Sequence, residues 1–276
     1  MEKMKLIAMD MDGTLLDDAQ RIPDENLAAL REAAAQGVHI AICSGRAAND
    51  LSYYASDAGL ADCHILALNG ACCLDKPHGT AYALHVIAEE SAARVTDTLL
   101  RHNVHFAAFQ QNRLIVVPGS ESIGLLEWGS HVMRDGPQAV AYGQEALVEY
   151  RAEGICKIVY IDMDHAPRIE EIRQELAPIP GIVVTSSWSN NLEIMPVDVH
   201  KGQALQALAE RLGVQREAVM ALGDYDNDLE MLQYAGMGIA MANASDAVKQ
   251  VAQWVTLSNV ECGVAAAIRK YVLNPA

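Results

Sequence analysis

The chain has 276 residues, 51% of them hydrophobic, so it is long enough to bury a core in one large domain or in two smaller ones. Its 36 acidic residues outnumber the 20 basic ones and give a net charge of −16, which argues against non-specific binding to nucleic acid or to an anionic membrane surface. A small phosphate needs only a local positive pocket and is compatible with this charge.

The N-terminal apolar segment is interrupted early by Asp10 and Asp12, and no apolar run approaches the roughly 18 residues of a membrane-spanning helix. The cysteines form no zinc-type CxxC pair and mostly lie in apolar stretches, which predicts buried free thiols in a reducing compartment. They are Cys43, Cys63, Cys72, Cys73, Cys156 and Cys262. We therefore expect a cytoplasmic protein.

The first 70 residues alternate between apolar strand patterns and helix patterns. Strands are predicted at 5–9, 38–43 and 64–68, and helices at 23–36 and 46–58. Both helices are followed by a glycine, Gly37 and Gly59, as is typical of helix C-termini. Continuous apolar strands joined by helices predict a parallel sheet that is covered on both faces.

The middle of the chain has a different pattern. A helix is predicted at 88–103, followed by a hairpin of strands 104–110 and 113–117 across Gln111-Asn112. A similar order recurs with a strand at 157–162, a helix at 168–176 and strands at 182–186 and 191–195. We interpret these stretches as two copies of a helix-plus-two-strand unit with antiparallel pairing, which predicts an inserted α+β domain.

The alternating pattern returns after Pro196. Helices are predicted at 202–212, 226–234, 245–251 and 263–272, and strands at 219–222 and 238–241. The sequence therefore predicts an α/β fold with a doubly wound parallel-sheet core at residues 1–82 and 192–276. The α+β insert occupies residues 83–191.

The stretch Asp10-Met11-Asp12-Gly13-Thr14 directly follows the first predicted strand. Two acids at i and i+2 before a glycine suit the mouth of a buried strand, although the turn after Asp10 can break their shared face. Such acids repel unless a cation lies between them, and Mg²⁺ with oxygen ligands is the natural occupant. A carboxylate with a usual pKa of about 3.9 is also charged at neutral pH and can attack phosphorus. The alternative is an ordinary acidic turn.

In a doubly wound sheet, ligands bind outside the carboxyl ends of the strands. Three further polar clusters follow predicted strands: Ser44-Gly45-Arg46, Asn69-Gly70 and Gly223-Asp224-Tyr225-Asp226-Asn227-Asp228. The Ser44 hydroxyl, the flexible Gly45 backbone and the start of the next helix together make a phosphate cradle. The alternative is that Ser44 only caps the helix and that Arg46 is a solvated surface cation.

Lys201 begins a predicted helix, where a compact ammonium can neutralise a transferring phosphoryl group. The helix macrodipole disfavours a lysine at a helix start, which indicates that Lys201 has a specific role. The ordinary alternative is a solvated lysine. Asp224 lies at a strand end and can complete a Mg²⁺ site with Asp10, while Asp228 can hold water on the metal. The alternative is an acidic first turn of a helix.

Taken together, these stretches resemble the haloacid dehalogenase superfamily of phosphatases, and most closely its Cof-type sugar-phosphatase branch. Its four motifs are matched in order by Asp10-Met11-Asp12-Gly13-Thr14, Ser44-Gly45-Arg46, Lys201-Gly202, and Gly223-Asp224 with Asn227-Asp228. Asn69-Gly70-Ala71, Asn259 and Gly263-Val264 also resemble that branch, whereas Ala242 and Cys262 depart from it outside the implied catalytic residues. The resemblance covers nearly all of the core, and it implies that the insert is the family's large C2-type cap.

The resemblance implies a Mg²⁺-dependent phosphatase that acts on small phosphorylated metabolites, with sugar phosphates as the first expectation. Asp10 is implied to be the nucleophile that forms an aspartyl-phosphate, and Asp12 to protonate the leaving alcohol and then activate water. Mg²⁺ is expected on Asp10, the Asp12 carbonyl and Asp224. Phosphate or substrate contacts are implied for Met11, Ser44, Gly45, Arg46, Lys201 and Asn227, and supporting roles for Thr14, Asn69 and Asp228.

Two other functions remain open, a phosphosugar mutase of the same fold and a non-catalytic phosphate-sensing regulatory protein. Asp12, Lys201 and the insert argue against the sensor. Substrate specificity is expected from the insert, with Trp188, Asn190 and Asn191 as candidates and with flavin or pyridoxal phosphates as the next substrates. The sequence does not predict the oligomeric state.

Overall fold

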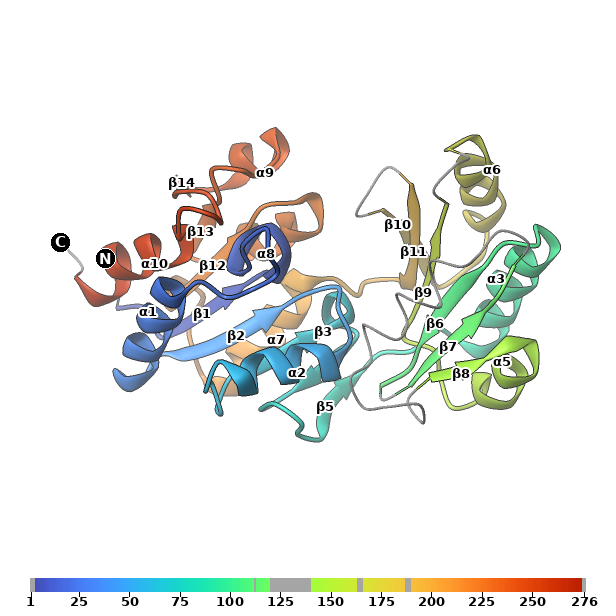
Figure 1. Ribbon diagram of the computed structural model, residues 1–276, viewed down its shortest axis with the longest axis horizontal. Helices are drawn as coiled ribbons and strands as arrows, with labels where there is room; N and C mark the ends of the chain where they lie inside the picture. The colour runs from blue at the N-terminus through green and yellow to red at the C-terminus, as the bar shows by residue number, and fades with distance from the viewer. Residues whose placement is uncertain (1–2, 112, 120–139, 163–165, 187–189, 275–276) are drawn as a thin grey trace. The chain divides into compact units, whose positions relative to one another are not determined.

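Figure 1 shows the computed structural model, which describes residues 3–111, 113–119, 140–162, 166–186 and 190–274. The chain divides into two compact units. Unit 1 consists of Met1–Gly45, Leu51–Tyr82 and His200–Ala276, and unit 2 of Arg46–Asp50 and Ala83–Val199. The sequence places the second boundary at 191/192, whereas the structure returns to unit 1 at His200 because residues 191–196 form a strand of the unit 2 sheet.

Unit 1 contains an eight-stranded sheet in the order β14-β13-β12-β1-β2-β3-β4-β5. The strands are β1 (Leu6–Met9), β2 (His39–Cys43), β3 (His64–Ala67), β4 (Cys72–Leu74), β5 (Ala81–Leu84), β12 (Val219–Gly223), β13 (Met237–Ala240) and β14 (Trp254–Val255). From β14 to β3 every neighbouring pair is parallel, and β4 then runs antiparallel to β3. The predicted doubly wound parallel sheet is confirmed, while the short strands β4, β5 and β14 were not predicted.

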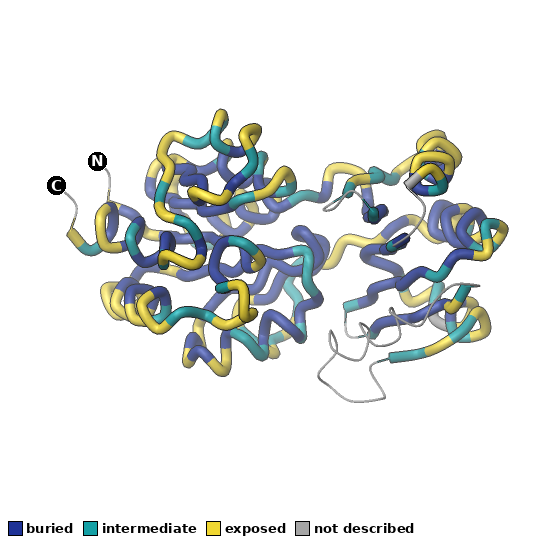
Figure 2. Tube along the Cα trace, turned by 45° about the horizontal axis from the view of Figure 1, so that its top comes forward, coloured by how far each residue is buried: buried dark blue, intermediate teal, exposed yellow. Residues whose placement is uncertain are grey.

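The centre of this sheet is β1, which lies between β12 and β2. All four of its side chains are fully buried, as are most side chains of the strands beside it (Figure 2). Successive side chains of a strand point to opposite faces, so complete burial means that both faces of the sheet are covered. The parallel pairing also brings the carboxyl ends of β12, β1, β2 and β3 to one edge.

The helices of unit 1 match the predicted ones with small shifts at their ends. They are α1 (Asp24–Ala35), α2 (Ala48–Asp57), α7 (Lys201–Leu212), α8 (Leu229–Tyr234), α9 (Asp246–Val251) and α10 (Gly263–Ile268). Helix α1 packs on α10, and α7 packs on α8. At its C-terminus α7 ends on Gly213 in the left-handed conformation, with φ of 66°, the usual helix-ending role of glycine.

Unit 2 contains a six-stranded sheet in the order β10-β11-β9-β6-β7-β8. The strands are β6 (Phe106–Phe109), β7 (Leu114–Val117), β8 (Val140–Tyr142), β9 (Lys157–Ile161), β10 (Ile182–Thr185) and β11 (Asn191–Pro196). The predicted hairpin of β6 and β7 is antiparallel, and Asn112 in its turn lies outside the described residues. Strand β8 was not predicted, and its parallel pairing with β7 makes the sheet mixed rather than purely antiparallel.

In the described part of unit 2, the helices are α3 (Glu89–Arg101), α5 (Gly143–Arg151) and α6 (Ala166–Leu176). Helix α3 buries Ala92, Val95 and Leu99 at the i, i+3, i+7 spacing of one helix face, and its opposite face is polar. That stripe packs with Ile172 and Leu176 of α6 in one hydrophobic cluster, which also holds alternate side chains of the sheet strands. The two helices therefore cover the same face of the sheet.

All six cysteines are free thiols, and all except the half-buried Cys262 are buried, as the sequence predicted for most of them. Burial raises the pKa of the Cys63 thiol to about 12, so this group is an inert core residue. In the described part of the chain, no helix combines the length and the apolar character that crossing a membrane would require.

One buried polar contact predicts a pH dependence of stability. The His64 side chain is 7% exposed, its Nε2 atom lies 3.4 Å from Nδ1 of His39, and its own Nδ1 atom has no hydrogen-bond partner within the described residues. Burial, helped by the nearby charges of His39 and Arg211 and opposed by Asp75 and Asp62, lowers the pKa of His64. His64 therefore binds a proton less readily in the folded chain than in the unfolded chain.

We expect the free energy of unfolding to fall as the pH drops below about 6.5, the ordinary pKa of histidine, and to level off below the lowered pKa of the folded state. Urea titrations of His64→Gln should show a flatter dependence across this window than the wild type. His85→Gln, at an exposed histidine, is the control. A His64→Gln protein with the wild-type slope would contradict the prediction.

Candidate active site at the carboxyl ends of the parallel strands

Asp10 follows the last residue of β1, and the chain then folds into a compact turn from Met11 to Leu15. The turn depends on Gly13, which has a φ of 77° and lies so close to Asp224 that a Cβ atom there would collide with its carboxylate. Only glycine adopts this conformation and leaves that space at little cost. The turn thus brings the end of β1 against the loop that follows β12.

The centre of the site is the ammonium group of Lys201. Lys201 is the first residue of α7, and the preceding His200 caps the helix by accepting a hydrogen bond from the backbone N–H of Gln203 at 3.2 Å. The Lys201 side chain is fully buried and donates from Nζ to Oδ1 of Asp10 and to Oδ1 of Asp228, both at 2.7 Å. The alternative of a solvated lysine is therefore wrong.

Asp228 is held in place by the loop after β12. Its Oδ2 atom accepts hydrogen bonds from the backbone N–H groups of Asp224, at 2.9 Å, and Tyr225, at 3.2 Å. A Cβ atom at Gly223 would lie 2.5 Å from the Cβ and Cγ atoms of Asp228, so the glycine leaves the room for this buried carboxylate. The loop is consequently built around the acid that pairs with Lys201.

Three carboxylates converge on this edge of the sheet. Asp10, Asp224 and Asp228 each offer one oxygen, and the three oxygens lie within 4.8 Å of one another. Thr14 donates from its hydroxyl to Oδ1 of Asp224 at 2.7 Å, which orients that carboxylate. The segment after β1 therefore supplies one of the three carboxylates, Asp10, and the hydroxyl of Thr14 that binds another, Asp224.

The electrostatics of the group follow from its burial. Burial raises the pKa of Asp10 well above its ordinary value, opposed by Lys201 and reinforced by the charges of Asp228 and Asp224. Burial also raises the pKa of Asp224 to about 6, against the lowering effect of the Thr14 hydrogen bond. For Lys201, burial alone would lower the pKa, but Asp10 and Asp228 together raise it, so the ammonium stays charged.

This donor set fits a hard divalent cation. Three carboxylates beside one lysine leave excess negative charge in a buried place, which is costly without a further positive charge. Oxygen is the ligand type that Mg²⁺ prefers, and Mg²⁺ usually takes one or two carboxylates together with water and phosphate oxygens. Asp10 and Asp224 were predicted as ligands, and the structure adds the carboxylate of Asp228 to the same group.

Asp12 is placed differently from Asp10. The turn breaks the strand geometry between them, so Asp12 is exposed whereas Asp10 is 6% exposed. The Asp12 carboxylate does not belong to the group of three, and the ligand expected from this residue is its backbone carbonyl. Two neighbouring acids with such different surroundings are suited to different chemical roles.

Ser44 and Asn69 lie together at the ends of β2 and β3. The backbone N–H of Ser44 donates to the carbonyl of Leu66 at 3.0 Å, and the Ser44 carbonyl accepts from the N–H of Asn69 at 2.9 Å. Asn69 has a left-handed φ of 54°, and its Oδ1 atom accepts from Nδ2 of Asn227 at 3.3 Å. The amide pair joins the loop after β3 to the loop after β12.

Arg46 and the specificity candidates of the insert do not belong to the group of three carboxylates. Arg46 pairs with Asp50 at 2.9 Å, and both belong to the segment that groups with unit 2. Asn190 accepts the backbone N–H of Asp162 at 2.8 Å, while Asn191 is buried and donates to Glu193 at 3.4 Å. Trp188 lies outside the described residues. Substrate contacts by Arg46 and by the insert residues stay predictions.

Asn243 also contacts the turn after β1, and the sequence did not predict it. Its Nδ2 atom donates to the carbonyl of Gly13 at 2.8 Å, and its Oδ1 atom accepts the backbone N–H of Asn259 at 3.0 Å. Asn259 in turn donates to the carbonyl of Leu16 at 3.0 Å, so the two asparagines bind the middle of the turn after β1 and the residue that follows it. Asn243 follows β13 at the same sheet edge as the predicted clusters, and that position was the available signal.

Comparison with known proteins agrees with this geometry. Residues 7–268 match the family of haloacid dehalogenase-like hydrolases. The chain belongs to this family. Its resemblance to the Cof-type phosphatase branch is confirmed, and relatives across nearly the whole chain are named phosphatases.

Two relatives come from Bacillus subtilis and are both named 5-amino-6-(5-phospho-D-ribitylamino)uracil phosphatase. YcsE is 33% identical over 98% of this chain and 96% of its own length, and YwtE is 32% identical over 95% and 96%. The solved structure of a haloacid dehalogenase-like hydrolase from Bacteroides thetaiotaomicron is 27% identical, covers 97% of this chain and 99% of its own, and has a TM-score of 0.85. This chain and the solved structure thus share the fold along nearly their whole length.

The buried ion pairs of Lys201 predict a large stability effect in this family member. Lys201→Met leaves Asp10 and Asp228 close together and buried without their shared cation, so in EDTA we expect a loss of about 3–5 kcal/mol in the free energy of unfolding. Urea denaturation measures it, and added Mg²⁺ should restore part of the loss. Lys249→Met on α9 should stay within about 0.5 kcal/mol of the wild type. Equal stability of both variants would count against the buried pairs.

Proposed function

We propose that the chain is a Mg²⁺-dependent phosphatase that hydrolyses small phosphorylated metabolites through an aspartyl-phosphate on Asp10. The observation that carries the proposal is the Lys201 ammonium held by Asp10 and Asp228, with Asp224 completing the three carboxylates. This arrangement supplies a positioned anionic nucleophile, a fixed positive charge and oxygen ligands in one small volume. Phosphoryl transfer depends mainly on such positioning and charge neutralisation.

In the first step, Oδ2 of Asp10 attacks phosphorus while the phosphorus–oxygen bond to the leaving alcohol breaks. Lys201 holds Oδ1 of Asp10, so the free rotation of the nucleophile is restricted before reaction. The leaving oxygen takes a proton from Asp12, whose exposed position suits contact with solvent and substrate.

In the second step, Asp12 accepts a proton from water as the water oxygen attacks phosphorus. The bond between Asp10 and phosphorus then breaks and inorganic phosphate is released. Ser44 and Lys201, helped by backbone N–H groups near Asp12 and Gly45, are assigned to the phosphoryl oxygens by family resemblance. Bound Mg²⁺ would neutralise charge on those oxygens, with Asp10, the Asp12 carbonyl and Asp224 as its ligands and Asp228 in support.

For the substrate, we propose phosphate esters of sugars and of sugar-like polyols. The relatives YcsE and YwtE are named for a substrate that carries a phosphorylated ribityl chain, which supports a polyol phosphate as one member of this class. A panel of sugar, ribityl, flavin and pyridoxal phosphates, assayed for released phosphate, would rank them. Turnover restricted to pyridoxal phosphate, which has no polyol chain, would contradict the proposed class.

We also propose a cytoplasmic location, in line with the six free cysteines. Thiols that stay reduced are typical of reducing compartments. Fractionation of the producing cells followed by detection of the chain tests this location.

Replacement of the nucleophile tests the reaction directly. Asp10→Asn keeps the size of the side chain but removes the attacking charge, so kcat for p-nitrophenyl phosphate should fall by at least about 1,000-fold. Asp226→Asn changes an acid of the nearby loop that does not belong to the three carboxylates, and it should stay within a few-fold of the wild type. Unchanged turnover by Asp10→Asn would refute the mechanism.

Metal removal tests the cofactor. Dialysis against EDTA should abolish turnover, and Mg²⁺ should restore it, because the reaction needs the positive charge of the metal ion that the carboxylates bind. Asp224→Asn should raise the Mg²⁺ concentration needed for half-maximal turnover by about 10-fold or more, since it removes a ligand charge. Asp226→Asn again serves as the control. Full turnover in EDTA would show that the proposed metal dependence is wrong.

A further inference from the structure

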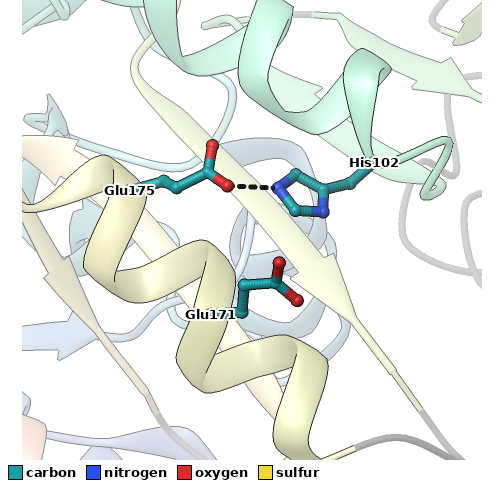
Figure 3. A group of neighbouring side chains, drawn as sticks. All are labelled: His102, Glu171 and Glu175. Carbon is teal, nitrogen blue, oxygen red and sulfur yellow. Dashed lines mark hydrogen bonds and ion pairs between the residues drawn. The ribbon is translucent and has the colours of Figure 1, made fainter.

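A second group of ligand-type side chains lies in unit 2, far in sequence from the residues of the candidate active site. His102, at the C-terminal end of α3, faces Glu171 and Glu175 of α6, and Figure 3 shows the three side chains pointing toward one another. One nitrogen of the imidazole and one oxygen of each carboxylate lie within 4.8 Å of one another. We propose that these three residues bind a transition-metal ion of the Zn²⁺ type.

The backbone already presents the ligands in suitable positions. Glu171 and Glu175 are four residues apart, so they share one face of α6. Helices α3 and α6 are fixed beside each other by the buried side chains of Leu99, Ile172 and Leu176. The site therefore rests on two packed helices rather than on loops, which limits the movement needed to bind an ion.

One ligand-to-ligand distance is already close to that around a bound ion. Nε2 of His102 lies 2.9 Å from Oε1 of Glu175. Two ligands at about 2.0–2.1 Å from a tetrahedral Zn²⁺ ion lie roughly 3.3 Å apart, so this pair needs only a small separation to admit the ion. Glu171 is exposed and has no hydrogen bond or ion pair within the described residues, so its side chain can rotate into place.

Charge and orientation also favour a cation here. Glu171 and Glu175 repel each other at i, i+4 spacing, and Arg101 neutralises only one of them. Arg101 donates from Nη2 to Oε2 of Glu175 and to the Thr98 hydroxyl, both at 3.1 Å. This contact fixes the Glu175 carboxylate and leaves Oε1 facing His102, the kind of supporting bond that orients metal ligands.

The ligand types separate this site from the three aspartates of unit 1. An imidazole with two carboxylates suits Zn²⁺, Co²⁺ or Ni²⁺, whereas Mg²⁺ prefers oxygen ligands alone. Three protein ligands leave a position for water, and the ion would join α3 to α6. Binding to the folded chain alone would therefore raise its thermal stability.

The test uses the full chain without added affinity-tag histidines and with an excess of millimolar Mg²⁺ to occupy the three aspartates of unit 1. Titration with Zn²⁺ in a calorimeter should show one bound equivalent, and Co²⁺ should broaden the imidazole NMR signals of His102. Zn²⁺ should also raise the midpoint of thermal unfolding. None of these measurements depends on turnover, so their failure leaves the proposed phosphatase function untouched.

Two variants and a matched control decide the assignment. His102→Ala and Glu171→Gln should each weaken Zn²⁺ binding by about 10-fold or more. Glu170→Gln removes the neighbouring acid, whose carboxylate pairs with Arg173, and should bind Zn²⁺ as the wild type does. If His102→Ala does not fold, Glu171→Gln decides, because this exposed side chain has no hydrogen bond or ion pair to lose among the described residues.

The proposal is overturned if Glu171→Gln binds Zn²⁺ as tightly as Glu170→Gln, or if Co²⁺ leaves the His102 signals unchanged. In that event the three side chains form only a surface ion-pair network between α3 and α6. Such exposed networks contribute little to stability and bind no ion specifically.

Discussion

The buried ammonium of Lys201 is the contact on which the candidate active site depends. An unpaired charge without exposure to water is too costly to persist, so Lys201 requires both Asp10 and Asp228. Those three residues come from the end of β1, the start of α7 and the loop after β12. Pairing the Lys201 ammonium therefore requires three parts of the chain, far apart in sequence, to lie next to one another. Gly13 and Gly223 leave the space for this close packing.

Burial also suits Asp10 and Asp12 to different chemical roles. Asp10 and Asp12 are two residues apart and identical in kind, yet one is paired with a cation inside the protein and the other is exposed. The buried acid is held in one orientation by Lys201, whereas the other acid is exposed to solvent. Asn243 and Asn259 bind the Gly13 and Leu16 carbonyls, so they help to hold the turn that carries Asp12.

Much of the fold was accessible from local patterns. The strands β1, β2, β3 and β12 are short continuous apolar runs that end in polar clusters, so their buried position and the edge where their ends meet follow from the sequence. The short strand β8 and the helix α5 carry no comparable pattern: β8 is half-exposed, and α5 buries little besides Leu147. Pairing with β7, rather than periodicity, determines a short strand such as β8.

By itself, the sequence determined the parallel α/β core, the inserted α+β unit and the polar residues at the strand ends, because period and residue type are local properties. Only the tertiary structure decided that Lys201 is buried between two acids rather than solvated, and that Asp228 joins Asp10 and Asp224. It alone also brought His102 to Glu171 and Glu175. Both groups join residues far apart in the chain, and their proximity arises from packing, which no local pattern records.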